Sequence, residues 1–227
     1  MDKTLRTIRE EIKENRAGNI PSITLLVDTN ILADYGWKRD DNVLYLFDTL
    51  VVDNYDNLLV IAPKISNVEF KAITKHERAA WLNLKGSIEG KLKDISRYKG
   101  FKKLYNNLDE SRSELDNLVR SLDRSLYEVL EILSNLMFFF ETELPLQDSM
   151  AFYISKDPEY GLLFEDALVF SFVKLVGKSL ENESKVLFLT GDRDFDVGKV
   201  LKELSEVGVE VYFNSGECLQ RVKALLE

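Results

Sequence analysis

Residues 23–30 read Ile-Thr-Leu-Leu-Val-Asp-Thr-Asn, in which the β-prone run Ile23–Val27 is followed at once by the acid Asp28. Such a run, with little polar alternation, is typical of a strand buried on both faces of a parallel sheet. Similar runs occur at 58–62, 186–189 and 209–213. Helical segments separate these runs, and this alternation predicts a parallel sheet with helices on both faces. We therefore expect an α/β protein with a three-layer α/β/α fold.

The segments around these strands predict the helices. Ser66 offers an N-cap for a helix that includes Glu69 and Ile73. The other predicted helices lie at 2–16, 31–50 (after a turn), 164–176, 197–206 and 217–226.

A long helical insertion interrupts the α/β pattern. Apolar residues recur at steps of three, four and seven between Leu108 and Leu136, as in an amphipathic helix that we expect to end at Pro145. One or two basic helices are predicted over 79–105, with breaks at Gly86, Gly90 and Gly100. We expect an N-terminal helix within 1–20 and one domain over 21–227, with the insertion at about 78–145.

Composition excludes several kinds of protein. Cys218 is the one cysteine among 227 residues, so the chain can form neither an internal disulfide nor a cysteine zinc site. The first 16 residues lack the apolar core of a signal peptide, and no apolar run could span a bilayer. We expect a cytoplasmic protein without a membrane partner.

The net charge of −9 hides a strongly basic segment. Between Lys64 and Lys103 there are eleven Lys and Arg against four Asp and Glu, an excess of seven positive charges, so the remainder carries −16. A polyanion interacts with the charge of the surface that it contacts, and not with the net charge of the whole chain. We expect six side chains of this segment to contact phosphates: Lys91, Lys93, Arg97, Lys99, Lys102 and Lys103. The alternative is that they form a solvated helix face. The spacing of Tyr98, Phe101 and Tyr105 favours packing in a core over stacking on bases.

Four acids stand where ligands bind in parallel sheets, outside the carboxyl ends of the strands. Asp28 and Asp192 follow strands, while Glu69 and Asp166 lie near helix starts. Crowded carboxylates repel one another, and Mg²⁺ or Mn²⁺ would neutralise them. Two such ions roughly 4 Å apart activate a water and stabilise the leaving oxygen of a phosphodiester.

Four segments resemble the successive acidic motifs of PIN domains, in the same order: Leu26–Asn30, Asn67–Phe70, Glu165–Leu168 and Leu189–Phe195. The resemblance covers about 23–75 and 160–213. It implies a Mg²⁺- or Mn²⁺-dependent endoribonuclease, a hydrolase that cuts single-stranded RNA by two-metal-ion catalysis. It further implies that Asp28, Glu69, Asp166 and Asp192 hold the metals. Asp194 would be an auxiliary acid, and Asn30 and Thr190 would orient the acids.

Two features depart from the family pattern. The third motif has two adjacent acids, Glu165 and Asp166, and the Ala167 that follows favours Asp166 as the ligand. The large insertion is unlike compact members, many of which are toxins paired with an antitoxin. An antitoxin or a second copy of the chain therefore stays open as a partner.

Other interpretations compete with an RNA nuclease. An Asp after a buried strand, such as Asp28, is also a common helix cap. A structure-selective DNA nuclease of related fold would use a similar cluster, and a non-catalytic scaffold would bind RNA or protein without cutting. A phosphatase of the haloacid dehalogenase type needs an aspartate two residues after its nucleophile, where this chain has Asn30.

Overall fold

The structure of the protein is a computed structural model that describes residues 3–98, 100–140 and 142–227, and only the backbone of 121–128. The chain divides into two compact units, Met1–Phe70 with Leu133–Glu227, and Lys71–Ile132. In the described residues, no helix has both the length and the apolar character needed to cross a membrane.

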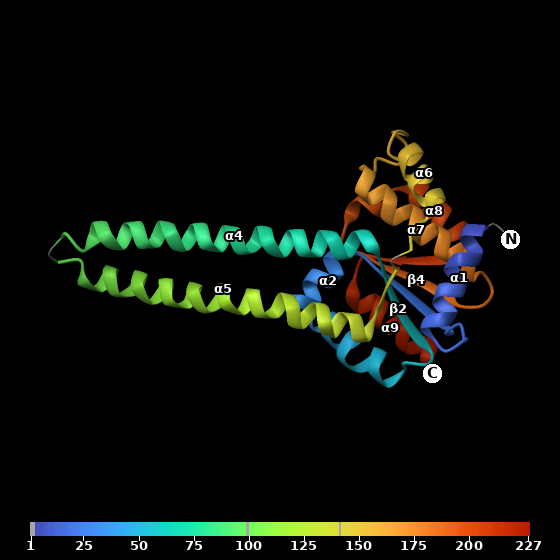
Figure 1. The fold of residues 1–227 in the computed structure, drawn as a ribbon, viewed down its shortest axis with the longest axis horizontal. Helices are drawn as coiled ribbons and strands as arrows, with labels where there is room; N and C mark the ends of the chain where they lie inside the picture. The colour runs from blue at the N-terminus through green and yellow to red at the C-terminus, as the bar shows by residue number, and fades with distance from the viewer. Residues whose placement is uncertain (1–2, 99, 141) are drawn as a thin grey trace. The chain divides into compact units, whose positions relative to one another are not determined.

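The first unit contains a five-stranded sheet in which every strand pairing is parallel (Figure 1). The strand order is β3-β2-β1-β4-β5. Four strands confirm the predicted ones, but the fifth, three phenylalanines at 138–140, was not predicted because it follows the long helix almost directly. The strands are β1 (Ile23–Val27), β2 (Leu58–Pro63), β3 (Phe138–Phe140), β4 (Lys185–Leu189) and β5 (Val209–Tyr212).

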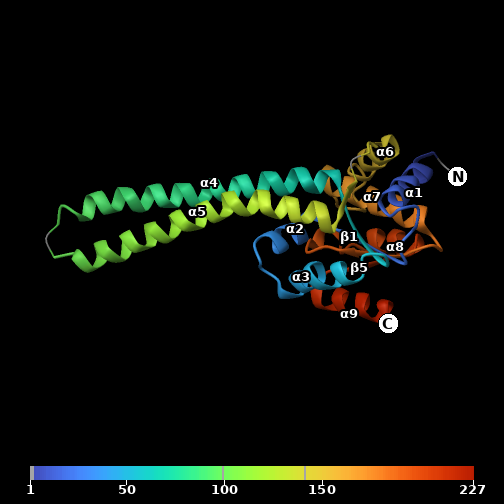
Figure 2. The same cartoon turned by 60° about the horizontal axis from the view of Figure 1, so that its bottom comes forward.

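Helices cover both faces of this sheet, which confirms the three-layer α/β/α fold (Figure 2). One layer contains α1 (Lys3–Asn15), α6 (Pro145–Ile154), α7 (Phe164–Leu180) and α8 (Gly198–Glu206). The other contains α2 (Thr29–Gly36), α3 (Asp41–Tyr45), the π-helix η1 (Leu46–Val51) and α9 (Ser215–Leu226). A short 3-10 helix, η2 (Arg193–Phe195), follows β4.

The strand register explains the main core of the first unit. Leu26 pairs with Ile61 of β2 and Phe188 of β4, and because side chains alternate along strands all three face the α7 layer. There they pack in one buried cluster with residues such as Ile8 of α1 and Phe170 of α7. The N-terminal helix is therefore part of the core of the first unit.

The second unit contains most of two long helices, α4 (Lys64–Ile95) and α5 (Lys102–Leu136), which run antiparallel and side by side in both views (Figures 1 and 2). Leu92 and Val119 are buried in this hairpin. Lys85 Nζ pairs with Asp116 Oδ1 at 2.6 Å across it. Helix packing and this ion pair thus hold the hairpin together.

Several predicted boundaries of the insertion were wrong. The helix starts at Lys64, directly after β2, so Ser66 lies inside it and is not its N-cap. It continues through Gly86 and Gly90, since a helix tolerates isolated glycines at about 1 kcal/mol each. Pro145 starts α6 at a position that suits its fixed φ. The second unit ends at 132, so β3 and α6 belong to the first unit.

Candidate functional site

Asp28 lies at the carboxyl end of the central strand and is 6% exposed. Its Oδ1 accepts a hydrogen bond of 2.6 Å from Thr29 N–H, so it caps α2, as the alternative interpretation held. Its Oδ2 accepts a bond of 2.9 Å from the Thr190 hydroxyl. Burial nevertheless raises the pKa of Asp28 to about 6, and the nearby charges of Glu69 and Asp192 add to the rise against the effect of the hydrogen bonds. Capping and a role in an acidic cluster therefore coexist in this side chain.

Thr190 connects the two central loops. Its hydroxyl donates to Asp28 and accepts a bond of 3.0 Å from the backbone N–H of Asp192. Asp192 Oδ1 in turn accepts from the Asp194 N–H at 2.9 Å and so caps η2. Beneath this loop, the ring of Phe195 is fully buried. Thr190 therefore hydrogen-bonds to Asp28 and to the loop of Asp192, and its role in orienting metal ligands stays a prediction.

Thr29 has an orienting role that the sequence patterns did not predict. Its hydroxyl donates a short hydrogen bond of 2.5 Å to Glu69 Oε2, which ties the start of α2 to the second turn of α4. Asn30 lies against Gly191, where an added Cβ would come within 3.6 Å of Asn30 Cβ. Among the described residues we find no hydrogen bond from the Asn30 amide to the acids. For the role of Thr29, the one signal in the sequence was that a threonine directly follows the capping Asp28.

Asp166 lies in the first turn of α7, where the helix dipole favours a negative charge. Even so, burial raises its pKa to about 6, and the charges of four other acids add to the rise: Asp192, Asp28, Asp194 and Glu69. In the part of the chain that the structure describes, no hydrogen bond to its carboxylate is found. Its neighbour Glu165 is exposed. Asp166 is therefore the member of the doublet that faces the cluster.

The acidic cluster, defined as Asp28, Glu69, Asp166, Asp192 and Asp194, belongs entirely to the first unit. The chain passes from β1 to β2 and β3 on one side of β1, then returns to β4 and β5 on the other. The ends of β1 and β4 thus flank the switch point, where parallel sheets bind ligands. Asp28 follows one of these strands and Asp192 the other.

The donors of the acidic cluster suit a hard divalent cation, because all of them are carboxylate oxygens. In the described residues, however, no three Asp, Glu, His or Cys side chains stand close enough to hold one ion together. Metal binding therefore requires some carboxylates to turn toward a shared ion. Asp166 and Asp194 can turn, since no hydrogen bond between described residues restrains either carboxylate.

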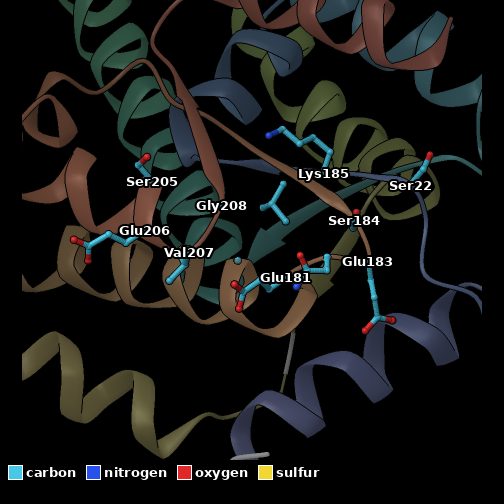
Figure 3. Close-up of a pocket in the computed structure, with 12 residues that line it drawn as sticks. Ser22, Glu181, Glu183, Ser184, Lys185, Ser205, Glu206, Val207 and Gly208 are labelled. Carbon is cyan, nitrogen blue, oxygen red and sulfur yellow. The ribbon is translucent and has the colours of Figure 1, made fainter.

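A separate cavity of about 560 Å³ lies at the amino ends of β4 and β5, the opposite edge of the sheet (Figure 3). Two of its charged side chains already have partners: Lys185 pairs with Glu210 at 2.7 Å, and Glu183 pairs with Arg9. The hydroxyls of Ser184 and Thr24 share a bond of 2.8 Å. With these polar groups satisfied internally, this cavity offers less chemistry than the acidic cluster.

The predicted phosphate contacts belong to the second unit. Lys91, Lys93, Arg97, Lys102 and Lys103 are all exposed, and none has an ion-pair partner among the described residues. Lys99 lies outside the described residues. Tyr98 and Phe101 are 66% and 54% exposed, so the prediction that they pack in a core was wrong. The spacing could not reveal that both rings are exposed in the connection between α4 and α5.

No family model matches the chain, and comparisons with curated protein sequences and with solved structures found no match either. The geometry and chemistry of the acidic cluster therefore carry the functional argument, together with the four motif-like segments.

The raised pKa of Asp166 makes the metal-free protein less stable at high pH. Its folded-state pKa of about 6 exceeds the usual value of 3.8, so the folded state gains stability as pH falls through 6 toward 4 and lacks it at pH 8. We expect Asp166→Asn to raise Tm in EDTA at pH 8 by a few degrees, about 1 kcal/mol after allowance for partial exposure. The gain should shrink at pH 5.

Glu165→Gln is the matched control for this measurement, because Glu165 is exposed in the same helical turn. Thermal unfolding at both pH values compares the two variants. Equal Tm changes for both variants at pH 8 would contradict the assignment of Asp166 to a repelling cluster.

Proposed function

We propose that the chain is a Mg²⁺- or Mn²⁺-dependent nuclease that hydrolyses phosphodiester bonds in single-stranded RNA. Asp28, Glu69, Asp166 and Asp192 would hold the metal, with Asp194 in support. The observation that carries the proposal is the convergence of acids at one end of the sheet, where Thr29 and Thr190 join Asp28, Glu69 and the loop of Asp192 through hydrogen bonds. Burial and the neighbouring charges there raise the pKa values of Asp28 and Asp166 to about 6. Such a cluster is a common sign of a functional site.

The residues around the acids have separable roles. Thr190 fixes one oxygen of Asp28, and Thr29 fixes one oxygen of Glu69. Asp166 has no such restraint among the described residues and can adjust to a ligand. When bound, Mg²⁺ or Mn²⁺ would activate the attacking water and stabilise the leaving oxygen of the phosphodiester. Outer hydrogen bonds of this kind orient metal ligands and tune their affinity.

Hydrolysis of RNA fits these residues better than the alternatives. A phosphatase with an aspartate nucleophile at position 28 would need a second aspartate at position 30, which is Asn. A scaffold without activity would gain nothing from five mutually repelling acids at one site. The resemblance to PIN-domain motifs favours RNA, and cleavage of DNA flaps in a nuclease panel would redirect the proposal to DNA.

Metal removal should abolish the activity. We expect EDTA to stop cleavage of a labelled single-stranded RNA, and Mg²⁺ or Mn²⁺ to restore it. Ca²⁺ should bind but support little turnover, because its looser coordination positions the water poorly. Undiminished cleavage in excess EDTA would rule out the mechanism.

Removing one charge from the cluster should abolish cleavage without unfolding the protein. We expect Asp28→Asn and Asp166→Asn each to lower kcat by more than about 100-fold, beyond the usual effect of losing an outer hydrogen-bond partner. Glu165→Gln should retain wild-type activity. Wild-type rates in both Asn variants, with circular dichroism showing intact folds, would place the site elsewhere.

The orienting role of Thr29 predicts a smaller effect. Thr29→Val keeps the shape of the buried side chain but removes the donor to Glu69, so activity or metal affinity should fall by about 10- to 100-fold. Thr29→Ser retains the hydroxyl and should restore most of the loss. If Ser and Val variants behave alike, the hydroxyl does not position Glu69.

A further inference from the structure

The connection between α4 and α5 exposes two aromatic rings. Tyr98 and Phe101 meet edge to face with ring centroids 6.5 Å apart. They border a hollow of about 370 Å³. We call this region the hairpin tip, defined by the residues that line the hollow: Ile95, Ser96, Tyr98, Gly100, Phe101, Lys102 and Tyr105.

Positively charged residues flank the hairpin tip in the sequence. From Lys91 to Lys103 the sequence has six Lys and Arg and a single acid, Asp94. The five of these cations that the structure describes are exposed and have no ion-pair partner among the described residues. By contrast, Lys85, further back on α4, pairs with Asp116 of α5. The cations near the tip are therefore available to a polyanion, as are Lys71 and Lys75 elsewhere in the second unit.

A merely solvated helix face would explain the lysines but not the rings. An aromatic side chain buries about 150–250 Å² when it packs, so two rings left in water forgo substantial stabilisation. The hairpin closes over Leu92 and Val119 instead. Aromatic rings interleaved with cations are the combination that binds unpaired nucleotides, by stacking on bases and neutralising phosphates.

We propose that the hairpin tip binds single-stranded nucleic acid, with Tyr98 and Phe101 stacking on unpaired bases and the surrounding cations contacting phosphates. The inference rests on the proposed function for the identity of that polyanion as RNA. A membrane surface fits less well, because interfacial helices need a continuous apolar face, whereas cations flank the two rings in the sequence and Lys102 lines the hollow beside them. The tip thus provides a binding site separate from the acidic cluster.

The test is fluorescence anisotropy of a labelled oligouridylate, about 20 nucleotides long so that it exceeds a typical single-strand site, with the full-length protein in EDTA, where cleavage does not interfere. Tyr98→Ala with Phe101→Ala should weaken binding at least about 10-fold, since each stacked base contributes substantially to affinity. The matched control is Phe152→Ala with Tyr153→Ala, an exposed pair of rings on α6 with centroids 5.8 Å apart. This control should bind as the wild type does.

The cations are tested separately by their salt dependence. Replacing Lys93, Lys102 and Lys103 with Glu should weaken binding and flatten the log–log salt dependence by about 2, from three contacts of about 0.7 each. The same charge change at three exposed lysines of the first unit, Lys3, Lys178 and Lys202, is the control. In cleavage assays the variant with Glu at positions 93, 102 and 103 should show a KM that rises far more than its kcat falls.

Each outcome bears on a different claim. Equal binding by the tip variants and their controls would overturn the tip site, as would tighter binding to phosphatidylserine vesicles or duplex than to the single strand. If the wild type binds the oligouridylate at the tip but cleaves no nucleic acid, the proposed nuclease fails while the tip site stands. Metal-dependent cleavage with undisturbed binding in the tip variants would instead support the nuclease and overturn the tip site.

Discussion

The burial of the Asp28 carboxylate beside other acids is the constraint on which the rest of the site depends. Asp28 directly follows the central strand, caps α2 and lies in a region that favours its protonated form. Two hydrogen bonds hold the side chain there despite that penalty, from Thr29 and from Thr190. A fold that needed only a helix cap would have no reason to gather Glu69, Asp166 and Asp192 around it. The divalent cation that we propose would remove this repulsion, so the proposed function would account for an arrangement that stability alone does not explain.

The parallel sheet produces this arrangement with few parts. Because β1 and β4 are neighbours, the loops that follow them meet, and Thr190 joins them through hydrogen bonds to Asp28 and Asp192. β2 leads directly into α4, which brings Glu69 to Thr29. Asp166 joins the cluster from the first turn of α7, and its carboxylate accepts no hydrogen bond from the described residues. The cluster thereby combines carboxylates that hydrogen bonds restrain with one that no hydrogen bond between described residues restrains.

Much of this could be predicted from local patterns, and the failures have physical causes. Four apolar runs predicted four strands, and the candidate acids were identified at two strand ends and near two helix starts, because these signals are local. The strand at 138–140 follows a long helix so closely that no turn residue marks it. The order of strands, which brings Asp28 beside Asp192, depends on contacts between distant segments. The role of Thr29 likewise depends on where α4 begins. The spacing of Tyr98 and Phe101 favoured core packing, but both rings lie in the connection between α4 and α5 and are exposed, which depends on where the helices end and not on local spacing.

The central claim is that the acidic cluster binds a divalent cation in exchange for protons. Calorimetric titration of Mn²⁺ at about pH 5.5 and at about pH 8, in buffers of differing ionisation enthalpy, tests it directly. With pKa values of about 6 for Asp28 and Asp166, binding at the lower pH should release protons that binding at the higher pH does not. Asp166→Asn should weaken binding and reduce that release. Absence of Mn²⁺ binding, or binding with the same proton balance at both pH values and in both proteins, would contradict the account.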